Sequence, residues 1–251
     1  MRLHAEVEGS GPRLVLVHGF TQTGRCWGPL ADRLARDHEV VRVDAPGHGR
    51  SAEIAADLWE TADLLARVGG PATWLGYSMG ARMVLHLALA HPEVARGLVL
   101  IGATAGIEDP AERAARRAAD RARARELAEV GLDAFLDRWL AQPLFATLPT
   151  ERAGTEERRT NTVEGLAASL VHAGTGTQEP LWSRLGEIGV PVLALAGARD
   201  ERYAALATRL ATAVGPGARA ALVPDAGHAA HLEAPDEVAA QVGRWLAEHG
   251  L

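Results

Sequence analysis

The stretch WLGYSMGARM, residues 74–83, places Ser78 between two glycines, Gly76 and Gly80. An apolar run that predicts a strand ends at Gly76, and a second apolar run, typical of a helix, follows Gly80. Between a strand and a helix, a turn this sharp accepts only small residues on either side of the serine. We therefore expect the Ser78 hydroxyl to stand above the C-terminal edge of a sheet, where open α/β folds bind ligands.

Short apolar runs bounded by Gly or Pro recur along the chain and predict buried strands. We expect strands at Leu14–Val17, Val40–Val43, Thr73–Gly76, Gly97–Ile101, Val190–Ala196 and Ala220–Val223. Amphipathic stretches between them predict helices at Trp27–Arg36, Ala52–Arg67, Ala81–Ala90, Ala204–Val214 and Pro235–Glu248. This alternation indicates an α/β fold, with a mostly parallel central sheet flanked by helices on both faces.

The alternation stops between residues 104 and 187. That span reads as helical and contains no convincing strand, and the strand pattern resumes after it. We interpret it as a helical cap inserted into one domain. The expected organisation is a first part of the core at residues 1–103, the cap at 104–187 and a second part of the core at 188–251.

Composition limits the classes of function. The net charge of −6 argues against a nucleic-acid binder, and no apolar stretch is long enough to span a membrane. The single cysteine, Cys26, excludes an internal disulfide and a Cys-rich metal site. No metal and no cofactor is expected. No apolar run long enough for a signal peptide precedes the first predicted strand, so we expect a cytoplasmic location. Oligomeric state is not indicated.

A serine hydroxyl needs a neighbouring base before it can react at neutral pH. His228 follows the last predicted strand, after Gly227, and is preferred to His231, three residues later. The base needs a carboxylate to orient it, and Asp200 lies just beyond a strand end. Its rival Asp225 is on the same loop as His228, where a turn-forming role is more natural. The order Ser, Asp, His is the one expected of an α/β-hydrolase.

Two backbone amides are candidates for an oxyanion hole, which stabilises negative charge that develops during a reaction. Met79 directly follows the serine and opens the predicted helix, where unpaired N–H groups favour negative charge. The turn at His18-Gly19, after an early strand, would direct the amide of Phe20 into the same site.

Five segments in order, HGF (18–20), DAPGHGRS (44–51), GYSMG (76–80), GARD (197–200) and AGHAAHLE (226–233), resemble the α/β-hydrolase superfamily. A narrower resemblance links GYSMGAR, RWLAQPLFATL, LAASLVHAGTGTQEPLW and AGHAAHLEAP to the MenH family. These enzymes are the 2-succinyl-6-hydroxy-2,4-cyclohexadiene-1-carboxylate synthases of menaquinone biosynthesis. The two middle segments lie in the expected cap, a region that varies widely across the superfamily.

This resemblance implies a lyase that eliminates pyruvate from 2-succinyl-5-enolpyruvyl-6-hydroxy-3-cyclohexene-1-carboxylate. Ser78, deprotonated by His228, would take a carbon-bound proton, Asp200 would orient His228, and Phe20 and Met79 would form the oxyanion hole.

A small-molecule polycarboxylate is then the expected partner, and arginine is the best carboxylate ligand. Arg82 lies one helical turn after Ser78, so it can face the same cleft. The resemblance adds Arg116, Trp139 and Arg159 from the cap and Tyr77 beside the serine. Arg117 or Arg158 could take the place of its neighbour.

Two other functions fit the same residues. One is a serine hydrolase, either a carboxylesterase or a C–C bond hydrolase, because acyl transfer also needs an activated hydroxyl facing an oxyanion site. The other is a small-molecule receptor on the same fold without catalysis. Residue spacing alone does not choose among the three.

Overall fold

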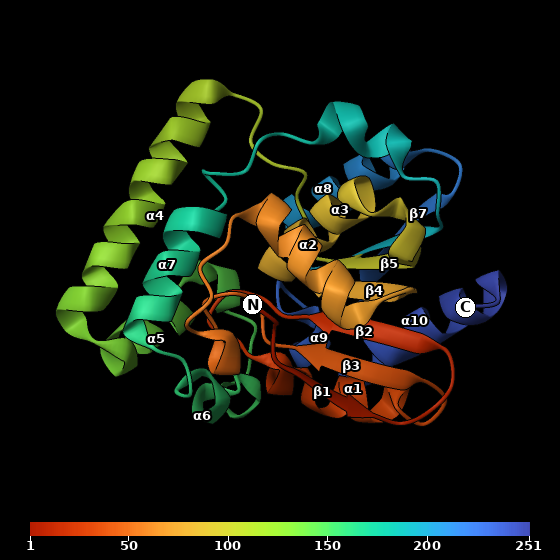
Figure 1. Ribbon diagram of the computed structural model, residues 1–251, viewed down its shortest axis with the longest axis horizontal. Coiled ribbons are helices and arrows are strands. Elements are labelled where there is room, and N and C mark those ends of the chain that lie inside the picture. The colour runs from red at the N-terminus through yellow and green to blue at the C-terminus, as the bar shows by residue number, and fades with distance from the viewer.

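The computed structural model describes residues 1–251 and is built on a seven-stranded sheet with helices on both faces (Figure 1). The strands lie in the order β1-β3-β2-β4-β5-β6-β7, and every neighbouring pair is parallel except β1 with β3. Their bounds are β1 Ala5–Glu8, β2 Arg13–Val17, β3 Glu39–Val43, β4 Ala72–Tyr77, β5 Ala95–Ile101, β6 Val192–Gly197 and β7 Ala218–Val223. The structure thus confirms the expected α/β-hydrolase architecture.

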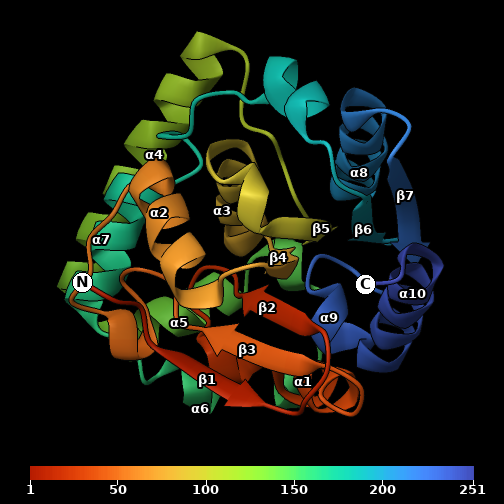
Figure 2. The same cartoon turned by 45° about the vertical axis from the view of Figure 1, so that its right-hand side comes forward.

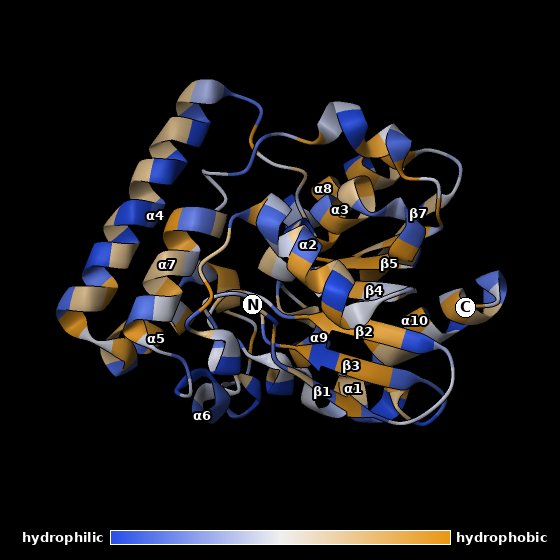
Figure 3. Ribbon diagram, in the orientation of Figure 1, coloured by the Kyte–Doolittle hydropathy of each residue, from blue (hydrophilic) through white to orange (hydrophobic).

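Residues of a strand alternate between two apolar layers. In β2, Leu14 and Leu16 pack into one cluster, whereas Val15 and Val17 pack into the other. The first layer is covered by α1 (Gly28–Leu34) and α10 (Pro235–His249), and the second by α2 (Leu58–Gly69), α3 (Met79–Ala90) and α8 (Glu201–Val214). Figure 3 shows orange, apolar residues along much of β2, β3 and β5 and on the helices that pack against the sheet. None of the helices has the length and apolar character needed to cross a membrane.

Two elements differ from the sequence prediction. Strand β1 is not among the predicted strands, because its sequence AEVE is only four residues long and half of it is charged. Helix α2 begins at Leu58 instead of Ala52. The Asp57 side chain accepts hydrogen bonds from the amides of Trp59 and Glu60, and this capping box sets the start of the helix.

The segment between β5 and β6 contains no strand, and we refer to its residues 104–187 as the cap. Its helices are α4 (Pro110–Val130), α5 (Leu132–Leu140), α6 (Thr155–Arg158) and α7 (Val163–Ala173), with two 3₁₀ turns between α5 and α6. Figures 1 and 2 show α4, α5 and α7 gathered beyond the arrowheads of β2 and β3. The cap has its own small apolar cluster, which is separate from the two core layers and consists of Ala124, Leu127, Phe135, Leu166 and Leu170.

Candidate active site

Ser78 occupies a strained corner between β4 and α3. Its φ angle is 50°, in the left-handed region that side chains other than glycine rarely adopt. Gly76 and Gly80 are required because other backbone atoms lie where a side chain would begin. A Cβ on Gly76 would lie 2.5 Å from the Cα of Ala81, and one on Gly80 would lie 2.0 Å from the carbonyl oxygen of Val17. The turn is therefore possible only with these two glycines, as the sequence indicated.

The structure brings Ser78, His228 and Asp200 together from three distant parts of the chain. The Nε2 atom of His228 lies 3.1 Å from Ser78 Oγ, and its Nδ1 atom lies 2.9 Å from Asp200 Oδ2. Asp200 is also the N-cap of α8, where Oδ1 accepts from the amide of Tyr203 at 3.2 Å. This second bond fixes the carboxylate, so that its other oxygen faces the imidazole.

The two rival residues have other partners. Asp225 is highly exposed and pairs with Arg199, so it does not contact the imidazole. The Nε2 atom of His231 lies 3.2 Å from the side-chain nitrogen of Gln22. Both rivals therefore lie outside the hydrogen-bonded chain that runs from Asp200 to the serine.

The amides of Phe20 and Met79 donate no hydrogen bond within the chain. Met79 is the first residue of α3, so its N–H has no carbonyl partner in the helix. Phe20 and Met79 both line the same cavity as Ser78. Two unpaired backbone donors beside the hydroxyl are the arrangement that oxyanion stabilisation needs.

A cavity of about 260 Å³ lies between the cap and the C-terminal ends of the strands, with Ser78 and His228 in its wall. Aromatic rings form part of the lining. Trp139 from α5 packs edge-on against Phe20 at 5.0 Å, and the ring of Tyr203 lies 4.3 Å from that of His228. Tyr77 also lines the cavity. Five arginines but only one carboxylate, Asp120, complete the charged lining: Arg82, Arg116, Arg123, Arg158 and Arg202.

Two of these arginines are buried without a carboxylate partner. Arg82, on α3, is 6 % exposed, and its side chain makes no hydrogen bond in the chain. Burial and, to a lesser extent, the nearby Arg116 together lower the pKa of Arg82 to about 10. Arg158 is 1 % exposed and donates only to neutral oxygens, the Ala153 carbonyl and the Thr21 hydroxyl. Burial likewise lowers the pKa of Arg158. Both guanidinium groups are therefore available to an anion that enters the cavity.

The single carboxylate of the lining, Asp120, bonds to two parts of the cap. Asp120 is buried, pairs with Arg116 at 2.8 Å and lies 3.6 Å from Arg123. Its second oxygen accepts from the amide of Gly176 at 3.1 Å, which ties α4 to the segment after α7. Arg116 thus lines the cavity, but its charge is already partly compensated by Asp120.

The structure corrects one predicted site residue. Arg159 is exposed, pairs with Asp133 at 2.8 Å and does not line the cavity. Arg158 lines the cavity in its place. The two residues are adjacent at the end of α6, so their side chains point in different directions, and a run of charged residues gives no sign of which one turns inward. Sequence reasoning also did not single out Asp120 or Tyr203, which carry no recognisable motif.

Comparison with known proteins shows the same fold and similar chains. Residues 14–241 match the model of the Alpha/beta hydrolase family. The structure of MenH from S. aureus superposes with a TM-score of 0.92 at 30% identity and covers 99% of each chain. A 2-succinyl-6-hydroxy-2,4-cyclohexadiene-1-carboxylate synthase from Enterobacter sp. (strain 638) is 34% identical, over 94% of this chain and 92% of its own.

A second group of relatives is equally similar. The pimeloyl-(acyl-carrier protein) methyl ester esterase of Stenotrophomonas maltophilia (strain K279a) is also 34% identical, over 98% of this chain and 96% of its own. Sequence identity therefore does not separate a lyase from an esterase. On the family match and the shared fold, the chain belongs to the alpha/beta hydrolase family.

Proposed function

We propose that this enzyme is a carbon–oxygen lyase of menaquinone biosynthesis. It eliminates pyruvate from 2-succinyl-5-enolpyruvyl-6-hydroxy-3-cyclohexene-1-carboxylate and releases 2-succinyl-6-hydroxy-2,4-cyclohexadiene-1-carboxylate. The observation that carries the proposal is the charge of the cavity over Ser78, where five arginines face one carboxylate. A substrate with several carboxylates supplies the missing negative charge.

The arrangement of groups accounts for the reaction. His228 Nε2 takes the Ser78 proton, and Asp200 stabilises the imidazolium that forms. The Ser78 oxygen then takes a proton from a ring carbon of the substrate. The electron pair of that C–H bond forms a double bond to the neighbouring ring carbon, the existing ring double bond shifts by one position, and the bond between the ring and the enolpyruvyl oxygen breaks. The enolate that leaves takes up, at its terminal carbon, the proton held by His228 and becomes pyruvate. The amides of Phe20 and Met79 stabilise the negative charge delocalised onto a substrate carbonyl oxygen.

Pyruvate release from the cyclohexene substrate tests this proposal directly. The purified wild-type protein is expected to release one pyruvate per substrate consumed, and Ser78→Ala is expected to abolish release while the protein stays folded. Arg159→Ala is the matched control, because its exposed side chain lies outside the cavity. Absence of pyruvate release from the folded wild-type protein would overturn the lyase assignment.

The second candidate is a methyl ester esterase that uses the same three residues. It is favoured by the 34% identity to the Stenotrophomonas maltophilia esterase. A methyl ester is neutral, however, and gives the buried guanidinium groups of Arg82 and Arg158 no partner. Methanol release from a pimeloyl methyl ester, with a transient acyl group on Ser78, is the outcome that this candidate requires. Binding of the cyclohexene substrate without turnover of either compound would instead indicate a receptor.

A further inference from the structure

The loop Gly19–Gln22, which carries Phe20, is held by hydrogen bonds at almost every backbone donor. The Gly19 amide donates to the Gln22 side-chain oxygen at 3.1 Å, and the Gln22 amide donates back to the Gly19 carbonyl at 3.1 Å. The Thr21 amide donates to Nε2 of His48 at 3.3 Å. Only the Phe20 amide is left free, so the direction of this N–H depends on how firmly its neighbours are held.

Thr21 is the strained residue of this loop. Its φ angle is 67°, and a β-branched residue in the left-handed region costs on the order of 1–2 kcal/mol. Such a conformation persists only where the surroundings fix it. Besides the bond to His48, the Thr21 hydroxyl accepts from Arg158, and the Thr21 carbonyl accepts from Asn161 Nδ2 at 2.8 Å. Two of its three polar atoms are therefore held by the cap.

Asn161 joins the cap to two core loops through a single buried side chain. Its Nδ2 atom donates to the carbonyls of Thr21 at 2.8 Å and Arg158 at 2.9 Å, and its Oδ1 atom accepts from the amide of Gly49 at 2.9 Å. Asn161 is 5 % exposed. Because Gly49 offers an N–H and Thr21 a carbonyl, only one orientation of the amide satisfies both.

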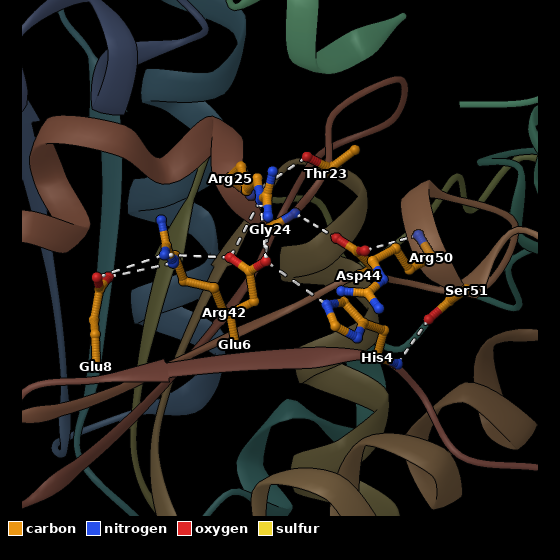
Figure 4. Close-up of polar contacts among 10 residues, drawn as sticks. All are labelled: His4, Glu6, Glu8, Thr23, Gly24, Arg25, Arg42, Asp44, Arg50 and Ser51. Carbon is orange, nitrogen blue, oxygen red and sulfur yellow. Dashed lines mark hydrogen bonds and ion pairs between the residues drawn. The ribbon is translucent and has the colours of Figure 1, made fainter. Parts of the chain in front are cut away.

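The loop that contains Gly49, residues 44–51, is itself anchored to the core, so it can support Asn161. Both oxygens of Asp44 accept backbone amides, from Gly24 at 2.8 Å and Arg50 at 2.9 Å (Figure 4). The Ser51 hydroxyl accepts from the amide of His4 at 2.9 Å, which ties the end of the loop to the segment before β1. Asn161 therefore connects the strained loop to a rigid part of the core.

We infer that Asn161 is a positioning residue for the oxyanion hole. By holding the Thr21 carbonyl, this cap side chain keeps the Thr21 backbone left-handed and aims the Phe20 amide at the reacting oxygen. The inference rests on the oxyanion role in the proposed function, but that role is shared by the lyase and the esterase. The end of α6 is accordingly a fixed attachment of the cap.

The test uses Asn161→Asp, which keeps the side-chain shape and replaces the donor to Thr21 with an oxygen. Thr160→Ala is the control, since the Thr160 side chain is exposed and bonds only within α6 and its end, to the Glu157 carbonyl. We expect kcat for a neutral p-nitrophenyl ester to fall by about tenfold to a hundredfold in Asn161→Asp, with KM changed by less than about threefold. A kcat within twofold of wild type would overturn the inference.

Hydrogen–deuterium exchange gives a readout that does not depend on activity. We expect the amides of the peptide spanning residues 18–23 to exchange faster in Asn161→Asp than in wild type or Thr160→Ala. Unchanged exchange there would overturn the inference even if turnover fell. If pyruvate release is absent in the wild-type protein while ester turnover and exchange respond as expected, the lyase proposal fails and the role of Asn161 stands.

Discussion

Replacing Arg82 with methionine is expected to stabilise the fold and to weaken substrate binding. The guanidinium is buried, has no carboxylate partner, and its pKa falls from the ordinary 12.5 to about 10, mainly through burial. That lowering corresponds to roughly 3 kcal/mol of unfavourable interaction for the charged form. Methionine has a similar length and no charge, so we expect the free energy of unfolding of Arg82→Met to rise by up to about 3 kcal/mol.

The effect on binding has the opposite sign. A charge-assisted pair between an arginine and a carboxylate contributes about 1.5–3 kcal/mol, so its loss raises KM roughly 10- to 150-fold. A neutral p-nitrophenyl ester has no carboxylate to pair with Arg82, and its KM is expected to change by less than about threefold. Together, the two expected effects describe a residue that binds substrate at a cost in stability.

Urea unfolding at pH 7 measures the first quantity, and steady-state kinetics with the cyclohexene carboxylate and the neutral ester measure the second. Arg159→Met is the control, since the exposed Arg159 pairs only with exposed Asp133 and should change neither quantity appreciably. Two results would refute the reasoning. One is a variant less stable than wild type by more than about 1 kcal/mol, well beyond the error of roughly a few tenths of a kcal/mol typical of such reasoning. The other is an equal rise in KM for both substrates.

Three further predictions follow from the same contacts. Asp200→Asn should lower kcat by up to about 10⁴-fold with little change in KM, because the amide no longer stabilises the His228 imidazolium; steady-state kinetics check this. Asp120→Ala should lower the free energy of unfolding by about 1–3 kcal/mol, since Arg116 and the Gly176 amide lose a buried partner; urea titration checks this. Burial lowers the pKa of His18 to about 4 and of His48 to about 3. Below about pH 6.5 the unfolded chain therefore binds more protons than the folded chain does. As the pH falls from 6.5 to about 4, the free energy of unfolding should decrease by roughly 1.4 kcal/mol per pH unit for each histidine. Urea unfolding across that pH range measures this decrease.

Local patterns explain why much of the core could be predicted from the sequence. Gly76, Ser78 and Gly80 define a turn whose geometry is set by neighbours within a few residues, and the apolar runs on either side identify its strand and helix. His228 is preferred over His231 because it directly follows Gly227, in the turn after the last strand. Such features depend on short-range sterics and on the fixed direction of parallel strands.

Long-range contacts set the limit of that prediction. Nothing near Asn161 shows that its amide bridges Thr21, 140 positions earlier, and Gly49, 112 positions earlier. Arg158 and Arg159 have the same neighbours in sequence, yet one is buried beside Thr21 and the other is paired at the surface. In these cases the packing of the cap on the core decides the role of each residue. Helix periodicity alone cannot predict that packing.

The separate apolar cluster of the cap bears on how the protein fails when heated. Five side chains, grouped around Leu127 and Leu166, hold α4, α5 and α7 together, against 33 and 23 in the two layers of the sheet. A unit with so little buried apolar area opens at lower free energy than the sheet does. Thermal inactivation should therefore begin with unfolding of the cap, at a temperature several degrees below the one at which the strands lose their pairing. Cooling from that intermediate temperature should restore turnover.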